Sequence, residues 1–198
     1  NGGLLGGRMI KLITYDTKND VNEAINGYNR LVGEDNAVAV IGPPTSNIGI
    51  ALAPIAEESQ VPIFGDFMDE TATTQEDGSV WSYMFLGEPS CGQQAQLIAS
   101  YALNELGISK FAILYDQSNA YAVSHAEPFD EYVTAAGAEV VAKEVFQSGD
   151  VDYRAQLTKI AQTDAGAIFM PNYAQQNALI YQQARQNGME QIFLGAAS

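Results

Sequence analysis

The sequence predicts an α/β fold in which parallel sheets carry helices on both faces. Short apolar segments typical of strands alternate along the 198 residues with longer segments in which apolar residues recur at helical spacing. The strand-like segment 111–115 (FAILY) is apolar throughout, as expected for a parallel strand buried on both faces. The alternation runs twice, before and after a linker-like Gly-Glu-Pro-Ser segment at 87–90. We therefore expect two units, 1–87 and 88–198.

The first unit opens with a strand and then alternates helices and strands. Ala24, Tyr28 and Leu31 show the helical spacing of its first helix. The strands are expected at 9–15, 37–41, 62–64 and 83–86, and the helices at 20–34 and 46–58. The polar, acid-rich segment 65–82 is predicted to be a loop.

The second unit repeats the same order of elements. Gly107, Gly137 and Gly188 directly follow predicted helices, where a left-handed residue commonly ends a helix. The helices are expected at 91–106, 122–136, 153–162 and 174–187, and the strands at 111–115, 140–146, 167–170 and 192–194. Parallel sheets in both units follow from this alternation.

The charge balance argues against several classes of partner. The chain has 24 acidic and 9 basic residues and a net charge of −15, whereas nucleic-acid-binding proteins need Lys and Arg to meet phosphates. The same balance disfavours an anionic membrane surface. The single cysteine, Cys91, cannot form an intrachain disulfide, and no apolar run has the length of a membrane span.

The residue inventory offers little for catalysis. No phosphate-binding loop, GxGxxG turn or GxSxG elbow is present. The chain has one histidine and one cysteine, so few catalytic Ser-His or Cys-His arrangements can form. No cluster of metal-ligating residues lies near His125 in the sequence. We expect no enzyme activity, no catalytic residue, no cofactor and no metal. His125 is predicted to lie on a helix surface and Cys91 to be an inert residue at a helix start. Trp81 is predicted to anchor its loop, and the alternative is that it stacks on a ligand.

The segment 37–62 carries the clearest candidate site. An apolar run, 38–41, is stopped by Gly42 and two prolines, and Ser46 then stands where a helix N-cap is expected, with Thr45 beside it. A hydroxyl at a helix start just past a strand is a place where open α/β sheets hold small polar ligands. The alternative is that Ser46 only caps its own helix.

Five segments of the chain occur in a characteristic order. They are NGGLLGGRMIKLITYDTKND, AVAVIGPPTSNIGIALAPIAEESQVP, FAILYDQSNAY, VDYRAQLTKIAQTDAGAIFMPNY and QARQNGMEQIFLG. Together they resemble the periplasmic branched-chain amino-acid binding proteins, the type I solute-binding proteins of ABC transporters that are similar to leucine/isoleucine/valine-binding protein. The likeness covers essentially the whole chain.

This resemblance implies two Rossmann-like lobes, 1–87 and 88–198, that close by hinge bending on a small-molecule ligand held in the cleft between them. It implies a periplasmic or extracellular protein, with a membrane-anchored lipoprotein as one option. Its closed form would be recognised by an ABC transporter permease, without catalysis. A ligand-sensing domain of a receptor or regulator on the same fold is the alternative.

The resemblance also implies that the chain is an internal fragment, incomplete at both ends. Relatives begin with a further strand and helix and continue well past the last matching segment. The first lobe would then lack a central strand, and the exposed backbone groups there favour a homo-oligomer if the chain stands alone.

The ligand-binding residues implied by the resemblance come from both lobes. Thr45 and Ser46 match a loop that meets the ligand's α-carboxylate, and Tyr121 and Tyr173 match tyrosines that line the cleft from the second lobe. The segment after 61–62 completes the carboxylate site in relatives with small residues and a threonine.

Here that segment departs from the family pattern. An ungapped alignment places Phe67 and Met68 at the small positions and Asp69 at the threonine, whereas a two-residue shift would place Thr71 there. Asp69 could equally be one more acid on a solvated loop. A carboxylate beside the ligand's own carboxylate would repel it.

Two further departures concern charge. Relatives often have an arginine where this chain has Leu86, and their acid for the ligand ammonium lies near 196–197, where this chain has alanines. The cleft is therefore expected to be more negative than in relatives, which favours an amine-rich, neutral or aromatic ligand over a plain aliphatic amino acid.

Overall fold

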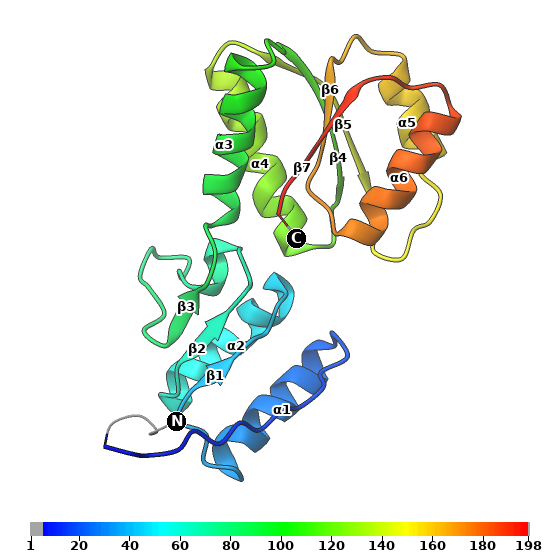
Figure 1. The fold of residues 1–198 in the computed structure, drawn as a ribbon. Helices are drawn as coiled ribbons and strands as arrows, with labels where there is room; N and C mark the ends of the chain where they lie inside the picture. The colour runs from blue at the N-terminus through cyan, green and yellow to red at the C-terminus, as the bar shows by residue number, and fades with distance from the viewer. Residues whose placement is uncertain (1–5, 198) are drawn as a thin grey trace.

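The computed structural model describes residues 6–197 and contains two separate parallel sheets (Figure 1). One sheet has the strand order β1-β2-β3 and the other the order β5-β4-β6-β7, and every pair of neighbouring strands is parallel. The predicted α/β class with parallel sheets is confirmed. Residues 1–5 of the first matching segment lie outside the described residues.

The N-terminal group of elements, in blue to green-cyan in Figure 1, surrounds the three-stranded sheet. Its elements are α1 (Val21–Gly33), β1 (Val40–Ile41), α2 (Ser46–Ser59), β2 (Ile63–Gly65), the 3₁₀ turn η1 (Glu70–Ala72) and β3 (Met84–Leu86). Buried side chains of α1 and α2 pack on one face of this sheet, where Ile63 and Met84 face them. The expected helices and the strands after β1 lie within a few residues of their predicted bounds.

The C-terminal group, in green to red in Figure 1, surrounds the four-stranded sheet. Its elements are α3 (Cys91–Asn104), β4 (Lys110–Asp116), α4 (Ala120–Ala135), β5 (Glu139–Phe146), α5 (Arg154–Ala161), β6 (Ala167–Met170), α6 (Ala174–Gln186) and β7 (Ile192–Gly195). Every element of this group that the alternation predicts is present.

Alternating residues of β4 explain why this second sheet is covered on both faces. Phe111 and Ile113 belong to a core formed with α3 and α4, whereas Ala112 and Leu114 belong to a core formed with α5 and α6. Because successive side chains of a strand point to opposite faces, a strand between two helix layers must be apolar throughout. The FAILY segment meets that requirement.

The predicted strand at 9–15 is not formed in the structure. This segment pairs with no strand among the described residues, and Met9, Ile10 and Leu12 are exposed. A strand is stabilised by its ladder of hydrogen bonds to a neighbour, so an apolar, β-prone sequence without a neighbour stays extended but unpaired.

The predicted strand at 37–41 is wrong in length and in burial. Only Val40 and Ile41 form β1, and the expected double-sided burial fails because Val38 is 87% exposed and Ile41 84% exposed. Ile41 is aligned with Phe64 and Phe64 with Phe85, and all three are exposed. We call this row the bare face of the first sheet. Among the described residues no helix covers it.

The chain crosses between the groups once, at 87–90, and a capping box starts α3 there. The hydroxyl of Ser90 accepts from the Gln93 amide, and the Gln93 side chain accepts from the Ser90 amide. The groups meet again where α2 approaches α4, next to the loops that follow β1, β2, β4 and β6. Figure 1 shows the C-terminus at this same end of the second group.

Candidate functional site

A cavity of about 270 Å³ lies where the two groups meet. Its lining combines residues of both groups: Asn19, Pro44, Thr45, Ser46, Asp66, Met68, Tyr121 and Tyr173. Most of these residues follow the carboxyl end of a parallel strand, since Asp66 comes directly after β2 and Tyr173 shortly after β6. This edge is where open α/β sheets hold their ligands. The structure thus brings together five of the predicted site residues: Thr45, Ser46, Met68, Tyr121 and Tyr173.

Ser46 lines this cavity, is buried, and hydrogen-bonds to the loop after β2; it is not the cap of its own helix. The N-cap of α2 is Thr45, whose side chain makes no capping hydrogen bond, and Ser46 is the first helical residue. The Ser46 Oγ accepts hydrogen bonds of 3.3 Å from the backbone amides of Met68 and Asp69. The interpretation of Ser46 as an N-cap is therefore wrong. With both lone pairs engaged, its hydroxyl proton is the group left for a ligand.

Thr45 lies beside Ser46 at the mouth of the cavity. Its hydroxyl donates a 3.0 Å hydrogen bond to the Oδ1 of Asn19, which sits in a turn with a positive φ of 56° just before α1. Because no side chain caps α2, the amides of its first turn and its positive dipole end are available at the cavity wall.

Tyr121 and Tyr173 form the opposite wall. Their rings stack with centroids 5.1 Å apart and an interplanar angle of 22°. The Tyr121 hydroxyl donates to the carbonyl of Ala197, which ties the start of α4 to the C-terminal end of the described chain. Burial raises the pKa of both phenols above the ordinary value, so both stay neutral. The wall is therefore uncharged and aromatic.

Met68 joins the two walls. It packs in a small apolar cluster with Cys91, Tyr121 and Ala122, and so links the N-terminal group to the first turns of α3 and α4. The Cys91 amide also donates a 2.8 Å hydrogen bond to the Met68 carbonyl. Part of the cavity floor is therefore a thioether, which suits an apolar ligand moiety.

Phe67 does not line the cavity. Its side chain is fully buried in the core of the N-terminal group, where its ring fills the space beside Gly49 and Gly65. Residues in an extended segment point alternately to opposite sides, so the neighbour of a cavity residue such as Met68 points into the core.

Asp69 is close to the cavity but does not line it. The side chain is only 3% exposed, which contradicts the alternative of an acid on a solvated loop. Its Oδ1 accepts from the amide and the hydroxyl of Thr71, at 2.9 and 2.7 Å, and its Oδ2 accepts from the hydroxyl of Ser124 at 2.7 Å. Thr71, the alternative occupant of the family's threonine position, is thus a partner of Asp69 and does not line the cavity either.

Three lining residues were missed by sequence reasoning: Asn19, Pro44 and Asp66. Asp66 could have been predicted, because it directly follows β2, at the strand end where such sheets hold ligands. No sequence pattern marked Asn19 as a site residue, because its contact with Thr45 depends on tertiary packing.

The cavity lining has a single ionisable acid and no base. Asp66 is the carboxylate, and none of the lining residues is Lys, Arg or His. The predicted shift toward negative charge relied on Asp69, which is not part of this lining, so it stays a prediction. The arrangement can offer helix amides and a hydroxyl to an anionic group, a carboxylate to a cation, and two stacked rings to an apolar body.

His125 is not on the surface, so that prediction is wrong. It is fully buried one helical turn after Tyr121, and its ring lies 4.5 Å from the Tyr121 ring. Its Nδ1 donates to the Tyr121 carbonyl at 2.9 Å, whereas its buried Nε2 has no hydrogen-bond partner among the described residues. Burial lowers the pKa of the imidazole below 6.5. The helix α4 turns this residue inward, toward the cleft wall.

Cys91 and Trp81 agree with their expected structural roles. Cys91 is completely buried at the start of α3, and desolvation together with nearby Asp69 and Glu70 raises the pKa of its thiol. Trp81 packs on the core of the N-terminal group.

Within residues 6–197 no group of three or more His, Cys, Asp or Glu side chains is placed to hold a metal ion. None of the helices in that range is long and apolar enough to cross a bilayer.

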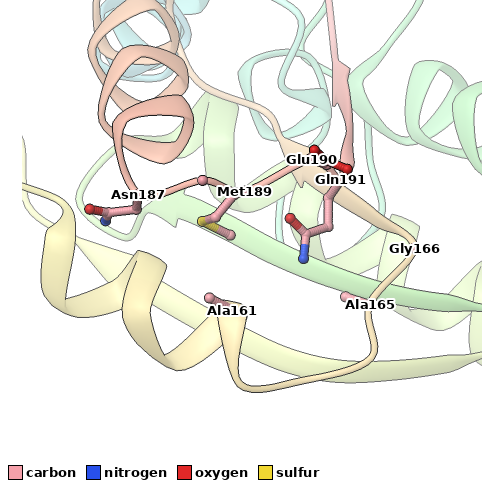
Figure 2. A pocket seen from close by; sticks show the side chains of 8 residues that line it. Ala161, Ala165, Gly166, Asn187, Met189, Glu190 and Gln191 are labelled. Atoms are coloured by element: carbon pink, nitrogen blue, oxygen red, sulfur yellow. The ribbon is translucent and has the colours of Figure 1, made fainter.

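A second, larger hollow of about 470 Å³ lies at the other end of the four-stranded sheet (Figure 2). This open hollow is bordered by the end of α5, the start of β6 and the turn between α6 and β7. Figure 2 shows Met189 and Gln191 pointing toward Ala161 and Ala165. Because it lies at the amino ends of β6 and β7, it is on the edge that open α/β sheets do not use for ligands.

Comparison with known proteins assigns the family. The model of the family described as periplasmic binding protein matches residues 1–198. This chain belongs to the periplasmic binding protein family. A relative, "Leu/Ile/Val-binding protein homolog 3" of Brucella melitensis, is 25% identical over 98% of this chain and 51% of its own length. The chain spans about half the length of the curated relatives it matches.

Solved structures show the same fold. The leucine-binding protein LivK of Thermotoga maritima is 29% identical, with a TM-score of 0.87 over 96% of this chain and 53% of that protein. The branched-chain amino acid transporter substrate-binding protein LivJ of Streptococcus pneumoniae, solved with isoleucine, is 30% identical, with a TM-score of 0.87 over 98% of this chain and 53% of that protein. The fold is that of the type I periplasmic binding proteins.

Proposed function

We propose that this protein is an extracytoplasmic solute-binding protein that holds an amino acid or a related small amine between two lobes for delivery to an ABC transporter. One observation carries the proposal. The cavity at the carboxyl ends of both sheets is built jointly by Ser46 at the start of α2 and the stacked pair Tyr121 and Tyr173. The periplasmic binding protein family supports the same role, as does LivJ, which is described as a transporter substrate-binding protein.

In this proposal each wall takes a different part of the ligand. The uncapped first turn of α2 and the hydroxyl proton of Ser46 receive an anionic group. Asp66 attracts the ammonium group, and the tyrosine rings cover the apolar part. Phe67 drops out of the proposed ligand contacts because it lies in the core, and Asp69 does so because its oxygens are already bonded.

The lobes of the proposal are 1–87 and 88–198, with the segment 87–90 as the hinge. The single covalent crossing there, and separate sheets on either side of it, support that division. Binding without catalysis fits the family, and the buried thiol of Cys91, with its raised pKa, is a poor nucleophile.

Calorimetry with a panel of ligands tests the binding site. The panel contains L-isoleucine, isoamylamine, 4-methylpentanoate and benzoate, measured on the protein and on Ser46→Ala and Tyr173→Ala. We expect L-isoleucine or isoamylamine to bind. Both variants are expected to weaken this binding at least tenfold, because each loses one buried contact with the ligand. Tyr181→Ala is the matched control, because Tyr181 is an exposed tyrosine outside the cavity. Full retention of binding by both cavity variants would refute the site.

Delivery to a permease is tested separately. If the protein serves transport, the ligand-bound form is expected to stimulate the ATPase activity of an ABC transporter from the same organism. Ligand binding without any such stimulation, in a protein fused to a signalling domain, favours the sensing role. Fractionation of the producing cell checks the extracytoplasmic location and any lipid anchor.

We also propose that the isolated 198-residue chain self-associates through the bare face. Ile41, Phe64 and Phe85 form a continuous apolar row there, and parallel sheets are ordinarily covered on both faces. Light scattering is expected to show oligomers that Phe64→Ser weakens. A monomeric 198-residue chain at all concentrations contradicts this expectation.

A further inference from the structure

The carboxylate of Asp69 connects the two groups of the fold. Asp69 is the N-cap of the turn η1, in the N-terminal group, and accepts two hydrogen bonds from Thr71 through Oδ1. Its Oδ2 accepts a 2.7 Å hydrogen bond from the hydroxyl of Ser124, which belongs to α4 in the C-terminal group. One oxygen thus bonds within its own loop, and the other bonds to a helix of the second group.

The position requires an acceptor with two oxygens. A carboxylate accepts only, and it can serve the Thr71 amide, the Thr71 hydroxyl and the Ser124 hydroxyl at once, whereas a threonine hydroxyl could not. Hydrogen bonds to a charged acceptor are stronger than neutral ones, especially where water is excluded. Asp69 is 3% exposed and Ser124 half-buried, so the carboxylate side of this bond is shielded from water.

Two other contacts join the groups beside it. The Ala120 amide at the start of α4 donates a 2.8 Å hydrogen bond to Oδ1 of Asn47 in the first turn of α2. Met68 packs against Cys91 and Tyr121 across the same boundary. Each of these contacts joins protein atoms directly, so none of them requires a ligand atom.

We propose that Asp69 and Ser124 form a latch that stabilises the closed arrangement of the cleft, and that Asp69 is a positioning residue and not a ligand contact. The inference rests on the proposed two-lobe function. The latch acts on the equilibrium between open and closed forms. A ligand that binds only the closed form loses affinity in proportion to the closed fraction, whatever its chemistry.

The first test measures the lobes without any ligand. Spin labels at exposed Glu58 and Glu131, replaced by cysteine, report the distance between α2 and α4, while the buried native Cys91 stays unlabelled. Ser124→Ala and Asp69→Ala, each of which removes one partner of the bond, are expected to shift the distance distribution to longer values. The double variant is expected to add nothing further. Ser124→Thr, which keeps the hydroxyl, is expected to restore the short distance. Ser100→Ala is the matched control, because Ser100 bonds only within its own helix.

The second test compares ligands. Ser124→Ala is expected to weaken every ligand that binds by the same factor, roughly five- to tenfold for the loss of one charge-assisted bond. A loss confined to ligands with a carboxylate would place Asp69 at the ligand and overturn the latch. Unchanged distances in Ser124→Ala would also overturn it. If the spin-label distance lengthens in Ser124→Ala but the parent protein binds none of the ligands, the latch proposal stands and the proposed function is refuted.

Discussion

The ring of Phe67 lies directly over Gly65, so close that a Cβ atom on Gly65 would overlap it. Gly49 of α2 is also next to this ring, and a Cβ there would come within 2.7 Å of it. Phe67 therefore occupies a slot that exists only because both neighbours lack side chains. The packing of Phe67 in this slot holds the adjacent backbone, from which the Met68 side chain points to the cavity.

Gly65→Ala is expected to destabilise the protein by about 1–3 kcal/mol, because the added methyl group overpacks a rigid core. Chemical denaturation measures the change. Gly195→Ala is the control, since Gly195 also ends its strand and a Cβ there meets nothing within 4 Å. Adding Phe67→Leu to Gly65→Ala should recover part of the loss; equal stability of the two glycine variants would show that the slot is not tight.

Ser46→Ala is expected to cost about 1–3 kcal/mol of stability even without ligand, because the buried amides of Met68 and Asp69 lose their acceptor. The same denaturation experiment with Thr45→Ala is the matched comparison. Thr45 has an exposed hydrogen bond to Asn19 and no capping bond, so its loss should stay within about 0.5 kcal/mol. A Ser46→Ala variant as stable as the parent would show that water replaces the hydroxyl.

The buried His125 should make stability depend on pH. Burial lowers the pKa of its imidazole below the unfolded value of 6.5, while its bond to the Tyr121 carbonyl and the charge of Asp69 oppose this shift. The native state then binds fewer protons than the unfolded state, so stability is full above pH 6.5 and falls as the pH drops toward the folded pKa. Melting temperatures between pH 7 and 5 should decline more steeply for the parent than for His125→Gln. Parallel slopes for the two proteins would contradict the assignment.

The thiol of Cys91 should be unreactive in the native protein. It is fully buried, and desolvation together with Asp69 and Glu70 raises its pKa, which suppresses the reactive thiolate. Reaction with a chromogenic disulfide at pH 8 should be slow in buffer and fast in denaturant. Rapid native labelling would mean that the contact of Cys91 with Met68 opens frequently.

The C-terminal group was predictable almost completely from its pattern. The centre of β4 and the whole of β6 are apolar, and a glycine follows α3, α4 and α6 within three residues. Each face of the sheet receives a helix layer, so local preference and tertiary packing agree. The segment 9–15 has an equally strong strand pattern and forms no strand, because pairing depends on a neighbour and not on the segment alone.

The sequence by itself determined the α/β alternation, the family and the identity of most residues that face the cleft. Only the tertiary structure decided which way they point. Ser46 accepts from a distant loop instead of capping its helix, Phe67 turns into the core, Asp69 bonds to Ser124, and His125 is buried. Local spacing specifies the element on which a side chain lies, whereas its partners are set by contacts between segments more than twenty residues apart.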